Sequence, residues 1–387
     1  MSLANEASLL LIPSGYKSRK VYSVFPTDGD GDFTFSRGSD GTRVGAGGLI
    51  ETMSSNIPRL DYLNSDCPSL LLESQRTNNI RYSENTTASD WTDPLGEWSS
   101  TSNTQMSPSG QINADTITLN DSNGSLIRIG GVSLTSGTYA VSFWIKDIDG
   151  NLLLGNVDIG DQGGGETNPP ISSVGSEWVR VERIISITST KTYIDIQINF
   201  SGTSNKISIW GLQVEQGSYP TNYIKTTGGA VTRQKDICIN GGDANLFDIT
   251  EGTFFVDVTP YFNTIANTYI SLNDGGSSDR LVFIFQSYGT SVRVFGVSAN
   301  SNFLSNYQNI TFNNRNKILL TFKQNEFKIY INGDLKYTDT SGNVPIGLNQ
   351  LDFTEHNGNR NFQGKVHDTR VYDRVLTQAE AIELTTL

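Results

Sequence analysis

Apolar and polar side chains alternate with a period of two along most of this chain, and this alternation restricts the fold to β-strands. Successive side chains of a strand point to opposite faces, so such a pattern predicts strands with one buried face. The clearest segments are TYAVSFWIKDI (138–148), EWVRVERIISIT (177–188), KTYIDIQINF (191–200), KISIWGLQVE (206–215), GTFFVDVTPYF (252–262), RLVFIFQSY (280–288) and NKILLTFKQNEFKIYINGDLKYTD (316–339). The sequence therefore predicts an all-β protein.

Two local motifs predict how some of these segments begin and end. Asn332 and Gly333 stand between two alternating runs, and both residues tolerate the positive φ angles of a tight hairpin turn. At the C-terminus, LTQAEAIELTTL is the one helical pattern that we identify. Thr377 is its expected N-cap, and Glu380, three residues later, completes a capping box.

Turn-rich stretches divide the sequence into three segments. The first, 1–87, ends in the polar stretch SENTTASDW, and the second, 88–240, closes with GSYPTNYIKTTGGAVTRQKD, whose proline and paired glycines are typical of a connector. The third segment is 241–387. We predict a small N-terminal β module followed by two antiparallel β-sandwich (jelly-roll) domains.

Charge and hydropathy exclude several functional classes. The formal net charge is −12, from 28 basic and 40 acidic residues, and no cluster of Lys and Arg offers a surface for phosphates, so we expect no nucleic-acid partner. The apolar run ASLLLI (7–12) is far shorter than the ~20 residues that span a bilayer and lacks a basic flank, so we expect neither membrane insertion nor a signal peptide. Cys67 and Cys238 form no CxxC pair and are expected to be buried free thiols.

A glycine-rich stretch, FSRGSDGTRVGAGGLIET (35–52), fails the test for a phosphate-binding loop. A dinucleotide fingerprint needs three spaced glycines before a helix, but Ile50 occupies the third position after Gly45 and Gly47, and the following residues continue as a strand. We therefore interpret the stretch as a turn and strand, in which Arg37 and Arg43 can pair with carboxylates such as Glu51 or Asp61 or with a neighbouring subunit.

Acidic loops leave calcium binding open. The aspartates of DGDGDF stand at the alternate spacing of a calcium loop, but Phe33 and Ser39 occupy the positions that need glycine and glutamate; the three aspartates are Asp28, Asp30 and Asp32. The loops NDGGSSD (273–279) and DIDGN (147–151) are further calcium candidates at a sandwich rim. We assign no other cofactor.

Catalytic residues are scarce. His356 and His367 are the only histidines, which makes a Ser/His/Asp triad or a histidine-bound metal hard to assemble. A paired-carboxylate glycosidase needs only two acidic side chains, and 40 are present, so a hydrolase stays an alternative. We name no catalytic residue and expect a non-enzymatic protein.

The second segment carries the better functional pattern, because its strands have one apolar face and one face that mixes aromatic and hydrogen-bonding side chains. Such a face suits sugars, whose apolar ring faces stack on aromatic rings while hydroxyls bond to amides and carboxylates. The alternative is a merely solvated outer face. Our carbohydrate-binding candidates are Trp144, Lys146, Tyr193, Asp195, Gln197 and Asn199, with His356, Asn357 and Arg360 as further rim candidates in the third segment. Trp178 and Trp210 are expected to pack in the core.

Several motifs of the first segment resemble the N-terminal module of bacteriophage tail-fibre and related virion proteins. In that group an arginine-bearing turn, a GLIE strand, PRLDY and PSLLLE.QRTN recur in this order. The matching positions here are Arg37, Arg43, Leu49–Glu51, Pro58–Tyr62 and Pro68–Asn78. This resemblance names a virion module and no reaction.

The other two segments resemble sugar-binding folds. The second, with WIK and IWGLQVEQGSYPTNYI, is similar to a carbohydrate-binding-module-like jelly roll. The third, with RNKILLTFKQNEFKIYINGDLK and FQGKVHDTRVYDRVLTQAEAIEL, is similar to laminin-G-like or concanavalin-like lectin domains. The resemblance implies that Tyr372 packs and that Asp368 pairs with a basic neighbour; it gives His367 no role.

The resemblance implies a tail-fibre or receptor-binding appendage of a phage virion, made in the cytoplasm of the host bacterium. Its expected partners are host cell-surface glycans and other virion proteins. A homotrimer is expected by analogy alone, since no heptad or collagen-like repeat is present. Three alternatives remain: a capsid or tail decoration protein without a ligand, a glycan depolymerase, and a secreted cellular lectin.

Overall fold

The structure is a computed structural model that describes residues 2–120, 125–149, 153–160, 174–201, 206–247, 250–262, 266–287 and 289–387. In this part, the helical elements are a 3-10 helix, η1 (Leu3–Glu6), and the short helices α1 (Ala244–Phe247) and α2 (Gln378–Thr385). Strands form the rest of the regular structure, which confirms the predicted all-β fold class. No helix in the described part is long and apolar enough to cross a membrane.

Contacts group the chain into two compact units, which we describe separately. Unit 1 comprises Met1–Ala46, Met53–Gln75 and Gln234–Leu387, and unit 2 comprises Gly47–Thr52 and Arg76–Arg233. The predicted sequence boundaries at residues 87 and 240 stay predictions. The first and third segments nevertheless pack together in unit 1. This differs from an arrangement in which each of the three segments packs as a separate module.

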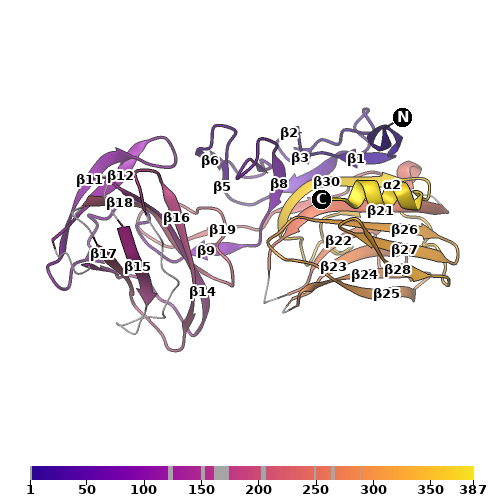
Figure 1. The fold of residues 1–387 in the computed structure, drawn as a ribbon. Coiled ribbons are helices and arrows are strands. Elements are labelled where there is room, and N and C mark those ends of the chain that lie inside the picture. The colour runs from indigo at the N-terminus through magenta and orange to yellow at the C-terminus, as the bar shows by residue number, and fades with distance from the viewer. Residues whose placement is uncertain are drawn as a thin grey trace. The chain divides into compact units, whose positions relative to one another are not determined.

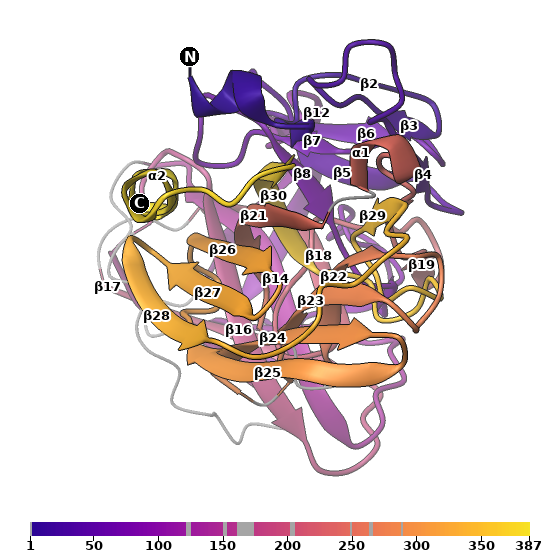
Figure 2. The same ribbon diagram turned by 90° about the vertical axis from the view of Figure 1, so that its right-hand side faces the viewer.

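Unit 1 is built from two large antiparallel sheets (Figures 1 and 2). The larger sheet has the order β28 (Asp334–Asp339), β27 (Glu326–Ile331), β26 (Asn316–Lys323), β21 (Glu251–Pro260), β30 (Gly364–Tyr372), β8 (Ser69–Leu72) and β7 (Leu60–Asp61), with β1 (Leu9–Leu11) also on β30. The smaller sheet has the order β25 (Ser301–Asn309), β24 (Ser291–Ser298), β23 (Arg280–Phe285), β22 (Thr268–Asn273) and β29 (Gln350–Asp352). Their apolar faces form one buried core.

The first segment completes the sheet of the third. One edge of β30 pairs with β21, and its other edge pairs with β8 along 364–366 and with β1 along 369–371. A smaller sheet adds β2 (Tyr16–Lys17), β3 (Lys20–Val21), β4 (Phe33–Ser36) and β20 (Ile237–Ile239) to this unit. β1 and β8 are buried along their whole lengths. Such strands need an apolar partner on both faces, which the third segment supplies.

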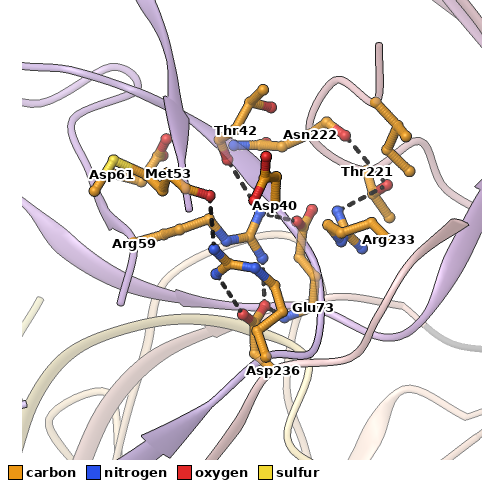
Figure 3. A network of polar contacts seen from close by, with 12 residues as sticks. Asp40, Thr42, Met53, Arg59, Asp61, Glu73, Thr221, Asn222, Arg233 and Asp236 are labelled. Carbon is orange, nitrogen blue, oxygen red and sulfur yellow. Dashed lines mark hydrogen bonds and ion pairs between the residues drawn. The ribbon is translucent and has the colours of Figure 1, made fainter. Parts of the chain in front are cut away.

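A buried ion network in unit 1 joins the first segment to Asp236, near the end of the second segment (Figure 3). Arg59 contacts Glu73 at 2.6 Å and also Asp236, while Arg37 contacts Asp236 at 3.1 Å. All four side chains are buried. Burial alone would lower the pKa of Arg59, but the charges of Asp236 and Glu73 raise it well above its usual value, so Arg59 stays charged. Arg37 thus pairs with a carboxylate, as expected, but its partner is the distant Asp236, which the sequence reasoning did not name.

Unit 2 is a sandwich of two further antiparallel sheets (Figure 1). One has the order β11 (Trp98–Met106), β12 (Ile112–Leu119), β18 (Lys206–Gln216), β14 (Gly137–Asp147) and β16 (Val179–Ile187). The other has the order β10 (Trp91–Thr92), β13 (Ser125–Ile129), β17 (Ile194–Ser201) and β15 (Leu153–Gly160). β9 (Arg76–Asn78) pairs with β19 (Val231–Arg233). In the described part of the chain, the remaining short strands are β5 (Gly41–Val44), which belongs to unit 1, and β6 (Ile50–Met53). The inner faces form a second apolar core.

The local sequence motifs are confirmed. Asn332 and Gly333 join β27 to β28 with φ angles of 51° and 88°. At the start of α2, the Thr377 hydroxyl accepts from the Glu380 amide at 3.3 Å, and the Glu380 carboxylate accepts from the Thr377 amide at 2.7 Å. Both motifs act over a few neighbouring residues, which explains why the sequence alone predicts them.

The closing strand β30 also matches its predicted pattern. Tyr372 is fully buried, and Asp368 forms an ion pair with Arg370 at 2.5 Å. Cys67 and Cys238 are free thiols as predicted, and Cys238 is buried, but the expected burial of Cys67 is wrong: it is exposed, because it lies in the turn between β7 and β8.

His367 on β30 makes unit 1 sensitive to acid. Burial is the main reason why the pKa of His367 falls from 6.5 to about 4; Arg315 and Lys365 act in the same direction, and Asp257 opposes them. The neutral ring lies 2.9 Å from the Thr259 hydroxyl. In the unfolded chain this histidine binds a proton at its ordinary pKa, so the unfolded state gains protons first as the pH falls.

We expect the free energy of unfolding to drop by on the order of 2 kcal/mol between about pH 6.5 and pH 4 because of this single group. Urea unfolding near pH 7 and near pH 4.5, compared between wild type and His367→Gln, measures it. The variant should lose less stability than wild type over this interval. An equal loss in both proteins would contradict this role of His367.

Candidate functional site

Trp144 and Lys146 lie on the outer face of unit 2, on β14. The Trp144 ring is half-buried and packs against Trp210 at 5.4 Å between ring centroids, while the Arg180 guanidinium lies 4.8 Å above the Trp144 ring. The Lys146 ammonium lies 5.1 Å from the ring centroid of Trp178. These aromatic rings therefore already contact protein groups on this face.

Trp210 is buried as expected, but it belongs to an aromatic cluster outside the main core of unit 2. This cluster contains Ala114 and Tyr223, with Trp144 and Trp178 partly buried against it. Trp144 and Trp210 thus cover the outer face of the sheet that contains β14. The main core of unit 2 lies on the other side of that sheet.

Tyr193, Asp195 and Gln197 lie in the other sheet of unit 2, at or just before β17. Asp195 is only 4% exposed, and Arg128 on β13 holds its carboxylate with two hydrogen bonds of 2.8 and 2.9 Å. The same guanidinium lies 4.0 Å from the centroid of the Tyr193 ring. Gln197 is exposed, and the side chain of Asn199 lies outside the described residues. An internal ion pair therefore occupies the carboxylate that we proposed for sugar binding.

The predicted jelly-roll residues do not form one site. Ile145 on β14 and Ile194 on β17 point into the core between the two sheets. Their neighbours Trp144 and Asp195 point away from that core, on opposite outer faces of the sandwich. A single sugar cannot contact both groups.

The rim candidates of the third segment do meet, in unit 1. Arg280 donates a hydrogen bond to Nδ1 of His356 at 2.6 Å, and Glu355 lies 3.8 Å from Arg280 and 3.5 Å from Arg360. Arg360 also donates to the Tyr269 hydroxyl at 3.0 Å. These groups border the outer face of the smaller sheet.

Asn357 lies in the same loop. It is exposed, and its side-chain oxygen accepts from the amide of Asn359 at 2.9 Å. Its amide group thus shapes the turn and stays open to solvent.

Strand pairing builds a surface beside this rim that the sequence reasoning missed. In the register of the smaller sheet, Arg293 on β24 stands opposite Tyr307 on β25, and Phe295 stands opposite Ser305. The Arg293 guanidinium lies 4.2 Å from the Phe295 ring centroid and 5.5 Å from that of Tyr307. We call this surface the arginine–aromatic face; it consists of Tyr269, Arg280, Arg293, Phe295, Ser305, Tyr307 and Arg360.

The arginine–aromatic face has an excess of positive charge in an acidic chain. Arg280 and Arg360 share the carboxylate of Glu355. Among the described residues Arg293 forms no ion pair; its nitrogen donates to the Ser305 hydroxyl at 3.0 Å. Tyr307 is 56% exposed. An exposed aromatic ring beside an arginine without a carboxylate can stack on a sugar ring and bind a carboxylate or sulfate on it.

The sequence contains a weak pattern that is consistent with this face. Arg293 and Phe295 alternate with Val292 and Val294, which belong to the core. An arginine at an alternating position marks an outward face, but only the pairing of β24 with β25 places Tyr307 beside it.

The acidic loops carry internal contacts. Asp32 accepts from the Ser23 amide at 2.9 Å and pairs with Lys20 at 3.2 Å. Asp279 accepts from the amides of Ala299 and Ile346 at 3.2 and 3.0 Å. Residues 150 and 151 of the third loop lie outside the described residues. No group of three His, Cys, Asp or Glu residues able to hold a metal is found among the described residues, and calcium binding stays a prediction.

This chain was compared with protein families, curated proteins and solved structures. The carbohydrate-binding module CBM40 of a Ruminococcus gnavus sialidase, bound to α2,3-sialyllactose, is 18% identical with a TM-score of 0.32, over 37% of this chain and 86% of that one. Domain 4 of the GH43 arabinanase AbnA of Geobacillus stearothermophilus, with arabinotriose, is 16% identical with a TM-score of 0.32, over 44% and 83%. No curated protein matches the chain. Residues 246–381 match the family model of the concanavalin A-like lectin/glucanases superfamily, which confirms the lectin-like fold predicted for this segment.

Proposed function

We propose that this chain is a non-enzymatic glycan-binding protein, and that it binds acidic glycans on the arginine–aromatic face of unit 1. The observation that carries this proposal is Arg293, which has no carboxylate partner among the described residues and lies between the rings of Phe295 and Tyr307. The match of residues 246–381 to a lectin/glucanase superfamily supports a binding role for the same sandwich.

The residues of this face have distinct roles in the proposed complex. Tyr307, which is exposed, stacks on the apolar face of a pyranose ring. Arg293 forms a charge-assisted pair with a carboxylate or sulfate of the sugar, and the Ser305 hydroxyl bonds to a neighbouring hydroxyl. An exposed contact of this size binds weakly, so binding to a cell surface would require several copies in one particle.

We further propose that these copies belong to a phage virion, as a homotrimeric tail fibre or receptor-binding appendage that contacts host-surface glycans. This part of the proposal depends on the resemblance of residues 37–78 to the phage module. An antibody against the chain that labels the tail of purified particles would support it. Labelling of the head would favour a decoration protein, and absence from the particle would contradict it.

Binding to a glycan array tests the function of the site. We expect Arg293→Ala and Tyr307→Ala each to weaken binding to carboxylated or sulfated glycans about tenfold or more, because each removes an interaction worth about 1–3 kcal/mol. Raising the salt concentration should weaken wild-type binding more steeply than the residual binding of Arg293→Ala.

The matched control is Lys323→Ala on β26 of the larger sheet, which removes an exposed cation (56% exposed side chain) away from the face. It should bind as wild type does. Binding of Arg293→Ala at wild-type strength would contradict the proposed site. Release of new reducing ends from the bound polysaccharide would instead favour the depolymerase.

A further inference from the structure

Unit 2 contains a polar cavity that none of the sequence motifs indicated. It has a volume of about 440 Å³, and all of its lining residues belong to unit 2. This volume lies in the range of ~300–1,000 Å³ that is typical of small-molecule sites. The predicted residues Trp144 and Asp195 do not line it. The cavity is therefore a different feature from the residues that the sequence predicted on the outer faces of the sandwich.

One wall of the cavity is a carboxylate held by three donors. Glu84 accepts from Lys225 Nζ at 2.6 Å, from the Tyr223 hydroxyl at 2.9 Å and from Asn113 Nδ2 at 3.2 Å. The lysine balances the negative charge, and the side chain of Glu84 is only 12% exposed. This wall is thus electrically neutral and fixed in place.

A second carboxylate fixes the opposite part of the lining. Asp115 is 1% exposed and accepts from the amide and hydroxyl of Thr86 at 2.7 and 2.9 Å. Its other oxygen accepts from the amide of Asn103 at 2.9 Å. Asn103 has a φ of 54° within an irregular part of β11, where the register shifts between Thr101 and Gln105. Asp115 therefore holds Asn103 at the cavity in a conformation that the strand alone would not adopt.

Asn113 leaves one hydrogen-bonding atom of the lining without a partner. A carboxylate only accepts hydrogen bonds, so the amide group that faces Glu84 must be the NH₂. This orientation leaves Oδ1 of Asn113 buried without a donor among the described residues. A buried polar atom without a partner costs about 1–3 kcal/mol, which a ligand hydroxyl would recover.

We propose that this cavity is a second binding site, for a neutral polyhydroxylated ligand of the size of one hexose unit. Its lining offers hydroxyls and amides as donors and acceptors, and its two carboxylates outnumber its one lysine, so it favours neutral sugars over anionic ones. Because Asn113 lines the cavity, a rotation of its side chain would expose Oδ1 to accept from one ligand hydroxyl. The inference is independent of the arginine–aromatic face, because the two sites lie in different units.

Saturation-transfer NMR with the full chain and single neutral sugars tests the proposal. The probes are glucose, galactose, mannose and N-acetylglucosamine, with glucuronate as the charged comparison. We expect at least one neutral sugar to bind in the millimolar range and glucuronate to bind at least tenfold more weakly. If no neutral sugar binds, or if glucuronate binds equally well, the proposal is wrong.

Two variants locate the binding. Ser102→Trp fills the cavity from an exposed position of β11 and should abolish the signal, whereas Ser186→Trp makes the same change at an exposed position of β16 and should not. Asn113→Ala should weaken binding about tenfold, because it removes the free acceptor.

Two further measurements serve as controls: the thermal midpoint of each variant, and neutral-sugar binding by Arg293→Ala, which alters the arginine–aromatic face. Each variant should keep its thermal midpoint within about 2 °C of wild type. If Ser102→Trp unfolds, Asn113→Ala decides the question alone. Arg293→Ala should leave the neutral-sugar signal intact; binding that this variant removes, or that both cavity variants retain, would overturn the assignment to the cavity.

Discussion

Arg59→Met should destabilise unit 1 by about 3–5 kcal/mol. The substitution keeps most of the apolar volume but removes the guanidinium between Glu73 and Asp236, neither of which is more than 1% exposed. Two carboxylates then remain in the interior with one fewer cation, and such uncompensated buried charge is strongly unfavourable. Arg37 continues to contact Asp236.

Denaturant unfolding, followed by fluorescence and circular dichroism, measures this loss. The matched control is Lys323→Met, which removes an exposed ion pair with Glu251 at 3.8 Å and should cost less than about 1 kcal/mol. Similar losses in both variants would show that the buried network contributes no more than a surface pair. The double variant Arg59→Met, Glu73→Leu should be more stable than Arg59→Met alone, because it also removes one of the two carboxylates that lose Arg59 as a partner.

The fragment 241–387 expressed alone should fail to form a stable, cooperatively unfolding domain. It lacks β1 and β8, which pair with one whole edge of β30. It also lacks Phe33 and Phe35, both fully buried in the core that the first and third segments share. Exposed strand edges and uncovered apolar surface favour aggregation over folding.

A chain in which 1–75 is joined to 234–387 by a short Gly-Ser linker is the matched control, and it should fold. The two ends to be joined are close, because Glu73 and Asp236 exchange backbone contacts: the amide of Asp236 donates to the carbonyl of Glu73 at 3.0 Å. Near-UV circular dichroism and calorimetry distinguish the two chains. A sharp thermal transition of the fragment at the temperature of the linked chain would contradict the shared core.

The sequence predicted the features that depend on neighbouring residues. Alternation identified the strands around Trp144 and Asp195, because the two faces of a strand follow from its own residues, whereas the strand that carries Arg293 was not among the predicted segments. The hairpin turn at Asn332 and the cap at Thr377 followed from turn and capping chemistry, and the closing pattern of the third segment identified a lectin-like sandwich.

The candidate site depended on contacts between distant residues, which alternation cannot supply. Alternation states that Trp144 and Asp195 point away from a core, but only the sheet order places them on opposite faces. Arg293 meets Tyr307 through the register of two strands. Arg59 meets Asp236 across 177 positions of sequence.

The chain by itself therefore determined its strands, its turns and the lectin-like class of its third segment. The tertiary structure decided which strands are neighbours, that the first segment completes the sheet of the third, and where charges and aromatic rings meet. The physical reason is that a strand fixes its own two faces locally, whereas its partners are chosen by the apolar area and hydrogen bonds that pairing buries. β1 shows this directly: its Leu-Leu-Leu run predicts burial on both faces, and only the edge of β30 reveals the partner.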